Sequence, residues 1–245
     1  MTGAVVDAVV LDYGGVMTTP TADSIAAWLA ADGIDPQSFS RTLKAWLSRD
    51  APTGTPVHRL ETGELSVDGF GELLAAELVT TDGRPVVAEG ILRRLFAGMR
   101  VEEAMFDLVA DLRSLGVRVG LLSNSWGNTY PRERIAEAFD HVVISGEVGL
   151  RKPQAEIYRL ALDGLGVPPE RAVFVDDAEP NLVGARRVGL RALLHTSPAD
   201  TRAALAALVP GLAATSPRPP TTSHDLPRPP TTSHDLPRPA ERSQR

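Results

Sequence analysis

Short apolar runs alternate with amphipathic helical stretches along most of this 245-residue chain. Each run has the length of a buried strand, about 4–8 residues. The stretches between them carry apolar residues at helical spacing, and several end at a glycine. Because such alternation produces parallel strands joined by right-handed crossovers, the sequence predicts an α/β fold: a Rossmann-like parallel sheet with helices on both faces. Strands are expected at Ala4–Leu11, Val117–Leu122, His141–Ile144, Ala172–Val175 and Arg191–Leu194.

The alternation is interrupted between about Thr21 and Met99, where only helices are expected. A helical insertion after the first strand would lie at the carboxyl end of the sheet, where α/β proteins bind ligands, and is well placed to act as a lid. We therefore predict an α/β core at residues 1–17 and 100–210, a helical cap at 18–99 and a tail at 211–245. The helices of the cap are expected at Ala22–Ala31, from Asp35 to Leu47, from the capping residue Ser66 to Leu78, and at Val87–Phe96.

The tail consists mainly of a ten-residue repeat. The segment PRPPTTSHDL occurs at Pro217–Leu226 and again at Pro227–Leu236. A segment so rich in proline, serine and threonine cannot bury a core, so the tail is predicted to be disordered. Its role is open, and one alternative is a proline-rich ligand for a partner domain.

Composition excludes several classes of protein. The net charge is −6, and the chain before Pro217 has 20 basic against 28 acidic residues, so nucleic acid is not an expected partner. There is no cysteine, which excludes disulfides and thiolate chemistry. No run of about 18 apolar residues indicates a membrane span, and the N-terminus lacks the basic region of a signal peptide. A cytoplasmic protein without a membrane partner is expected.

Polar side chains follow four of the predicted strands at the point where each strand ends. Asp12 follows the first strand, and Ser123-Asn124 follows the second. Lys152 comes after the third, and Asp176-Asp177 follows the fourth. Each feature alone is also typical of an ordinary turn. Because the carboxyl ends of parallel strands meet at one edge of a sheet, we expect these residues to converge.

The converging residues favour phosphoryl chemistry. The carboxylate of Asp12 can attack phosphorus or carbon and form a covalent ester. Two aspartates brought together repel each other unless a cation lies between them, and Mg²⁺ accepts carboxylates, a backbone carbonyl, water and substrate phosphate. A serine hydroxyl and a lysine ammonium group would bind phosphate oxygens and offset charge. The substrate class expected is a small phosphorylated metabolite, with Mg²⁺ as cofactor.

At these motifs the sequence resembles the haloacid dehalogenase-like (HAD) hydrolase superfamily. The stretches SGEVGLRKPQAEIY and FVDDAEPNLVGARRVGL are similar to its third and fourth motifs, and the resemblance extends over residues 4–195. Within the superfamily the chain resembles the branch that contains the N-terminal phosphatase domain of soluble epoxide hydrolase. The motifs that carry the resemblance are Asp12-Tyr13-Gly14-Gly15-Val16, Leu121-Leu122-Ser123-Asn124, Lys152-Pro153 and Val175-Asp176-Asp177.

The resemblance implies a role for each of these residues. Asp12 is the expected nucleophile and metal ligand, while Ser123 and Asn124 contact the phosphoryl group. Lys152 steadies the nucleophile and the phosphate. The further metal ligands implied are the Gly14 backbone carbonyl, Asp177, and Asp176 either directly or through water.

One position departs from the family pattern. Phosphatases of this family usually place a second aspartate, the general acid and base, two residues after the nucleophile, where this chain has Gly14. A positioned acid contributes about 10²–10⁴-fold to the rate, so esters with poor leaving groups should react slowly. One hypothesis is that the cap supplies the missing group through His58 or Glu61.

Two alternative functions stay open. A 2-haloacid dehalogenase also uses a nucleophilic aspartate without the second one, but the Asp176-Asp177 pair favours a cation site instead. A non-catalytic binding or regulatory protein on the same scaffold is the other alternative. The sequence selects neither a substrate nor an oligomeric state, so both a monomer and a homodimer are retained.

Overall fold

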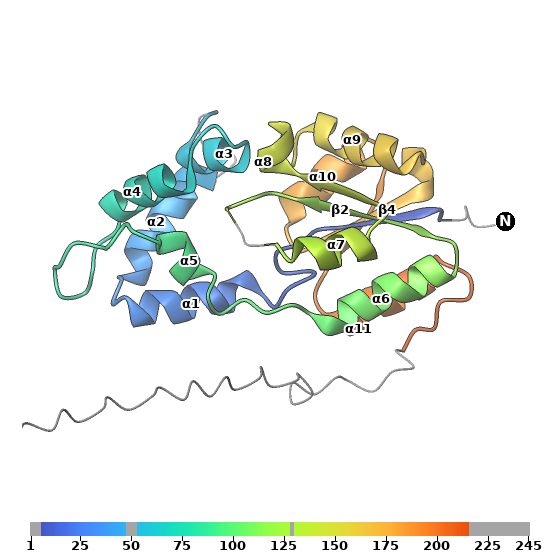
Figure 1. The fold of residues 1–245 in the computed structure, drawn as a ribbon, viewed down its shortest axis with the longest axis horizontal. Coiled ribbons are helices and arrows are strands. Elements are labelled where there is room, and N and C mark those ends of the chain that lie inside the picture. Colours follow the sequence, from blue (N-terminus) through green and yellow to red (C-terminus); the bar gives the residue numbers. More distant parts are fainter. Residues whose placement is uncertain (1–5, 48–52, 128–129, 216–245) are drawn as a thin grey trace, which may run out of the picture.

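The computed structural model describes residues 6–47, 53–127 and 130–215. Of the tail predicted at 211–245, only residues 211–215 are described, and Leu212 among them is buried in the core, so the core extends slightly further than predicted. The repeats and their predicted disorder lie outside the described residues. Five parallel strands form one sheet in the order β3-β2-β1-β4-β5 (Figure 1). The predicted α/β fold with a Rossmann-like parallel sheet is confirmed. The strands are β1 (Ala8–Leu11), β2 (Arg118–Ser123), β3 (His141–Ile144), β4 (Ala172–Asp176) and β5 (Arg191–Leu194).

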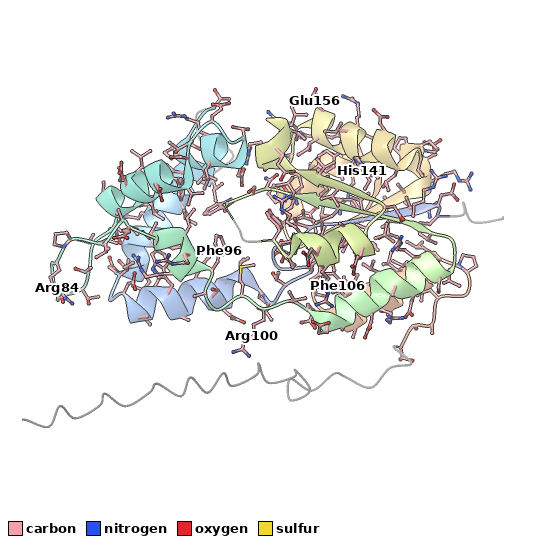
Figure 2. The ribbon with its side chains drawn as sticks, in the orientation of Figure 1. Arg84, Phe96, Arg100, Phe106, His141 and Glu156 are labelled. Carbon is pink, nitrogen blue, oxygen red and sulfur yellow. The ribbon has the colours of Figure 1, made fainter. Side chains whose placement is uncertain are left out.

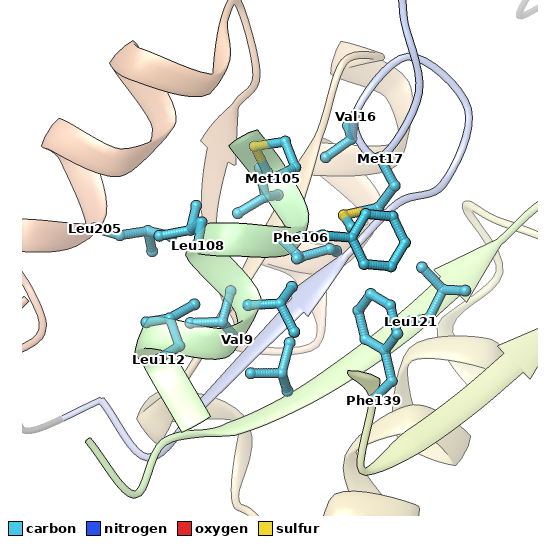
Figure 3. Packing of buried hydrophobic residues seen from close by; sticks show 14 of the residues in the cluster. Val9, Val16, Met17, Met105, Phe106, Leu108, Leu112, Leu121, Phe139 and Leu205 are labelled. Carbon is cyan, nitrogen blue, oxygen red and sulfur yellow. The ribbon is translucent and has the colours of Figure 1, made fainter. Parts of the chain in front are cut away.

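Helices cover both faces of the sheet because alternate strand residues point to opposite sides. Val9 and Leu11 of β1 face a cluster built with α6 (Glu103–Ser114), α7 (Arg132–Ala138) and α11 (Pro198–Ala206). Figure 3 shows Val9 beside Leu108 and Leu112 of α6, and Leu121 on the side of the cluster where Phe106 and Phe139 lie. Ala8 and Val10 face the opposite cluster, which is built with α9 (Ala155–Leu165) and α10 (Glu179–Arg187).

The described residues between Thr21 and Met99 form five helices and no strand. We call residues 18–99 the helical insert; its extent as a separate cap domain stays a prediction. It lies beyond the carboxyl ends of the strands (Figure 1) and has its own apolar cluster, which includes Trp28, Phe39 and Phe70. The helices are α1 (Thr21–Ala31), α2 (Pro36–Leu47), α3 (Pro56–Glu61), α4 (Val67–Glu77) and α5 (Ile91–Leu95).

The two connections between insert and core run side by side. An antiparallel bridge joins Thr18 to Val101, and the Thr19 backbone N–H donates to the Arg100 carbonyl at 2.8 Å. Figure 2 shows Arg100 at this connection and Arg84 at the outer end of the insert. The chain thus enters and leaves the insert through one narrow pair of segments at its base.

Most predicted helices are present with small shifts at their ends. Ser66 caps α4 by accepting from the Gly69 N–H, and Ser197 caps α11 in the same way. The helix expected at Val87–Phe96 begins only at Ile91, because Gly90 has a left-handed φ of 62° and starts a new turn. No helix in the described part of the chain is long and apolar enough to cross a lipid bilayer.

Candidate active site

A buried lysine joins the ends of two neighbouring strands. The ammonium nitrogen of Lys152 lies 2.7 Å from Asp12 Oδ1, after β1, and 2.7 Å from Asp176 Oδ2, at the end of β4. Lys152 is 1% exposed, Asp176 0% and Asp12 8%. A charge so deeply buried is tolerated only when it is paired and hydrogen-bonded. The three residues predicted from different strand ends therefore form one contiguous charged group.

Asp176 is held by donors on its other sides. Its Oδ1 accepts from the Ala178 N–H at 2.8 Å, and Asn181 Nδ2 donates to both carboxylate oxygens at 3.0 and 3.1 Å. Asn181 lies in the first turn of α10 and is not among the site residues predicted from the sequence. With Lys152 added, every oxygen of Asp176 already has a partner. Asp176 is thus better suited to anchoring Lys152 than to binding a metal directly.

A candidate metal centre lies beside this pair. Oxygens from Asp12, Asp176 and Asp177 all lie within 4.8 Å of one another. Gly15 adjoins Asp177: its φ is +78°, and a Cβ atom there would overlap Asp177 Oδ2. Of these three carboxyl groups, those of Asp12 and Asp176 contact the ammonium group of Lys152. The donor set of hard oxygens and its excess negative charge fit a divalent cation such as Mg²⁺.

Burial controls the protonation of the nucleophile candidate. Desolvation raises the pKa of Asp12 to about 8; the Lys152 ammonium group opposes this shift, and the Asp176 carboxylate adds to it. Burial alone would lower the pKa of Lys152, but the neighbouring Asp12 and Asp176 raise it instead. The cation-free site therefore holds a charged lysine beside a carboxyl group that keeps its proton near neutral pH. A bound cation would have to displace that proton.

The residues after β2 differ in their contacts. Ser123 is buried, and its Oγ lies 3.0 Å from the hydroxyl of Tyr130. The Tyr130 ring packs on the ring of Tyr13, with centroids 4.8 Å apart. Tyr130 therefore contacts both Ser123 and Tyr13, the residue that follows Asp12. Tyr130 is not among the site residues predicted from the sequence. Its hydroxyl contact with Ser123 depends on the fold and has no signal in the sequence pattern.

Asn124 acts on the backbone of Lys152. Its side-chain Oδ1 accepts from the Lys152 N–H at 2.8 Å, and its Nδ2 donates to the Lys152 carbonyl at 3.2 Å. Both polar atoms of the amide are thereby engaged. The contact between Asn124 and a phosphoryl group stays a prediction. The structure shows instead that Asn124 hydrogen-bonds to the backbone of Lys152.

A sequence model of the haloacid dehalogenase-like hydrolases matches residues 6–189, which is most of the described chain. The chain belongs to the haloacid dehalogenase-like hydrolase family. The resemblance of its four motifs to this family is thus confirmed.

The relatives of this HAD-like hydrolase include phosphatases. It is 36% identical over 108 residues to glyceraldehyde 3-phosphate phosphatase of Methanothermobacter thermautotrophicus, covering 42% of this chain and 47% of that protein. It is 29% identical over 123 residues to bifunctional epoxide hydrolase 2 of Rattus norvegicus, covering 47% of this chain and 22% of that protein. These matches span less than half the length of either relative.

The fold is shared with solved structures of the family. A HAD family enzyme of Bacteroides thetaiotaomicron, crystallised with magnesium and inorganic phosphate, has a TM-score of 0.56 and 20% sequence identity. The match covers 78% of this chain and 94% of that chain. At this identity the likeness supports the fold of the HAD-like hydrolase.

Gly14 of this HAD-like hydrolase leaves room for a side chain. A Cβ atom there would meet only Thr21 Cγ2, at the ordinary contact distance of 3.6 Å. Gly14 also lacks the left-handed φ that marks its neighbour Gly15. Neither space nor backbone conformation therefore requires glycine at the position where family phosphatases usually carry an acid.

Glu61 from the insert is already committed to other partners. Its Oε1 accepts from Trp126 Nε1 at 2.8 Å, and its Oε2 accepts from Arg151 Nε at 2.5 Å. Both carboxylate oxygens of Glu61 are therefore engaged by residues of the core. For His58, burial and the nearby Arg151 lower the pKa. The structure thus shows Glu61 in contact with two core residues, and the acid role of Glu61 or His58 stays a hypothesis.

Proposed function

We propose that this HAD-like hydrolase is a Mg²⁺-dependent phosphatase that acts on a small phosphorylated metabolite through an aspartyl-phosphate on Asp12. The observation that carries the proposal is the buried Lys152 bridge between Asp12 and Asp176, beside Asp177. Related proteins named as phosphatases, and the fold neighbour with bound magnesium and phosphate, support it.

The proposed metal site would use Asp12, Asp177 and the backbone carbonyl of Gly14, with Asp176 acting mainly through Lys152. When bound, Mg²⁺ supplies a counter-charge for the phosphate and for the nucleophile. Lys152 and Ser123 would bind phosphate oxygens and stabilise the charge that develops on them. In this arrangement the protein contributes mostly positioning, which is what phosphoryl transfer requires.

The reaction would proceed in two displacements. An oxygen of Asp12 forms a bond to phosphorus while the bond to the leaving oxygen breaks and its electron pair stays on that oxygen. Water then attacks phosphorus, releases inorganic phosphate and regenerates the Asp12 carboxylate. The leaving oxygen must acquire a proton in the first step, and Gly14 offers none.

The absence of a proton donor at Gly14 determines which substrates we expect the enzyme to prefer. Without a positioned acid, esters of poor leaving groups should lose about 10²–10⁴-fold in rate, whereas aryl and acyl phosphates lose little. We therefore propose that the enzyme is slow on alkyl phosphates and faster on phosphates whose leaving group departs as a stable anion.

The deciding experiment measures hydrolysis of an aryl phosphate and of acetyl phosphate with Mg²⁺. Asp12→Asn should abolish turnover, and so should EDTA. Asp7→Asn is the matched control, because Asp7 precedes the same strand at its other end and pairs with Arg171. Halide release from a 2-haloacid that persists in EDTA would point to the dehalogenase alternative. A folded protein that binds Mg²⁺ but hydrolyses neither phosphate would favour the non-catalytic alternative.

A further inference from the structure

Glu61 is a buried carboxylate at the boundary between the helical insert and the core. It is the last residue of α3 and is only 4% exposed. Its two carboxylate oxygens accept from Trp126, in the segment after β2, and from Arg151, the residue before Lys152. A buried carboxylate needs such partners, and here both of them come from the core.

The backbone of Glu61 makes a third contact with the core. Its carbonyl accepts from Ser145 Oγ at 2.5 Å, and the same Oγ accepts from the Ser125 N–H at 2.7 Å. Ser145 begins α8 (Ser145–Val148), directly after β3. One residue of the insert thus engages the segments that follow β2 and β3 as well as the segment that carries the catalytic lysine.

Packing brings the same surfaces together. Trp126 is a core residue, but its ring lies against the apolar cluster of the insert, 5.7 Å from the Phe70 ring. At Gly63 the two backbones approach so closely that a Cβ atom would lie 2.6 Å from the Gly146 carbonyl oxygen. Gly63 also has a left-handed φ of 78°, which a residue with a side chain rarely adopts.

The lysine segment is therefore held from two directions. The side-chain amide of Asn124 forms two hydrogen bonds with the backbone of Lys152, and Glu61 forms an ion pair with the side chain of Arg151, the preceding residue. No other ion pair between a described residue of the insert and a described residue of the core is present. Movement of the insert away from the core would break the ion pair between Glu61 and Arg151.

We propose that Glu61 is a positioning residue that couples the placement of the helical insert to the placement of Lys152. Its carboxylate holds the insert on Trp126, after β2, and on Arg151, while its backbone carbonyl holds the insert on Ser145, after β3. The kinetic part of this inference rests on the proposed phosphatase function, whereas the structural part does not.

The structural part is tested by hydrogen–deuterium exchange on Glu61→Gln. We expect backbone amides in α3, α8 and residues 150–153 to exchange roughly tenfold faster or more, since a buried ion pair is lost. Glu64→Gln is the matched control: it removes the same charge three residues along, at an exposed position without an ion pair to any described residue. Unchanged exchange in Glu61→Gln would overturn the proposal.

A second pair of variants tests the docking of the insert on the core without altering charge. Gly63→Ala forces the insert away from Gly146 and should accelerate exchange in the same segments as Glu61→Gln. Gly146→Ala is its control, because the added Cβ would meet its nearest atoms at 3.6 and 3.8 Å. If Gly63→Ala leaves exchange as slow as in Gly146→Ala, the close approach does not hold the insert and the proposal is wrong.

Kinetics separate a positioning role from an acid role. For Glu61→Gln we expect kcat/KM to fall by the same factor, about ten- to hundredfold, for an aryl and an alkyl phosphate, since a displaced Lys152 affects both. The loss should fall on kcat more than on KM and be equal across pH. An additional loss for the alkyl phosphate alone, with one limb of the pH profile removed, would identify Glu61 as the acid and overturn the proposal.

The two proposals fail in different ways. Faster hydrogen–deuterium exchange in Glu61→Gln, with no phosphate hydrolysis by any of these proteins, wild type included, would contradict the phosphatase function and leave the Glu61 contact established.

Discussion

The Lys152 ammonium group and Asp12 Oδ1 lie 2.7 Å apart in a site where both side chains are almost completely buried. The two residues come from segments separated by 140 positions, and they meet because β1 occupies the centre of the sheet. Pairing at this depth makes each charge dependent on the other. The electrostatics of the site can therefore be tested through stability as well as through turnover.

Removing the lysine charge should destabilise the fold. Lys152→Met leaves the fully buried Asp176 carboxylate without its cation, and we expect the free energy of unfolding at pH 7 to fall by about 3–5 kcal/mol. Phosphate hydrolysis should fall at least about 100-fold. Urea denaturation measures the first effect. Lys44→Met, on the exposed side of α2, is the control and should stay within about 0.5 kcal/mol of wild type.

Stability without Mg²⁺ should depend on pH through Asp12. Its pKa in the folded protein is raised from 3.8 to about 8, so the folded state binds more protons than the unfolded state between these values. The contribution of Asp12 to stability is complete below pH 4 and is lost as pH rises to about 8. Asp12→Asn should remove this contribution to the pH dependence of the free energy of unfolding.

Magnesium binding should show the opposite dependence. Because the cation must displace the Asp12 proton, the Mg²⁺-induced increase in Tm should be larger at pH 8.5 than at pH 6. Differential scanning calorimetry with and without Mg²⁺ measures this difference. An increase in Tm that is equal at both pH values, or that persists in Asp12→Asn, would show that the cation binds elsewhere.

Restoring an acid at position 14 should broaden the substrate range. Gly14→Asp fits the available space, and we expect it to raise turnover of an alkyl phosphate by about tenfold or more while changing aryl phosphate turnover little. Gly15→Asp is the contrasting variant, since its side chain would overlap Asp177 and should abolish Mg²⁺ binding. Equal effects of Gly14→Asp on both esters would show that proton donation is not what the enzyme lacks.

The hydroxyl of Tyr130 should contribute to phosphate binding through Ser123. Tyr130→Phe keeps the ring contact with Tyr13 but removes the 3.0 Å contact with Ser123 Oγ. Loss of one such hydrogen bond corresponds to about 1 kcal/mol, or roughly fivefold weaker inhibition by inorganic phosphate. Ser123→Ala should have the larger effect, and adding Tyr130→Phe to it should change little. Additive losses would mean that Tyr130 acts independently of Ser123.

The sequence by itself determined the architecture and which residues converge in the candidate site. Buried strands and amphipathic helices differ in period and length, so their alternation alone indicates a parallel sheet. Parallel strands place their carboxyl ends at one edge, which is why Asp12, Ser123, Lys152 and the Asp176-Asp177 pair were expected to converge. These inferences need only local patterns and one geometric property of the sheet.

The tertiary structure alone decided how those members are connected. Asn181 on Asp176, Tyr130 on Ser123 and Asn124 on the Lys152 backbone depend on where loops and helix ends meet in space. Glu61 and Arg151 are separated by 90 positions, and their ion pair follows from the docking of the insert on the core. Such contacts have no period or spacing along the chain, because each one is set by the packing of elements that the local sequence does not position.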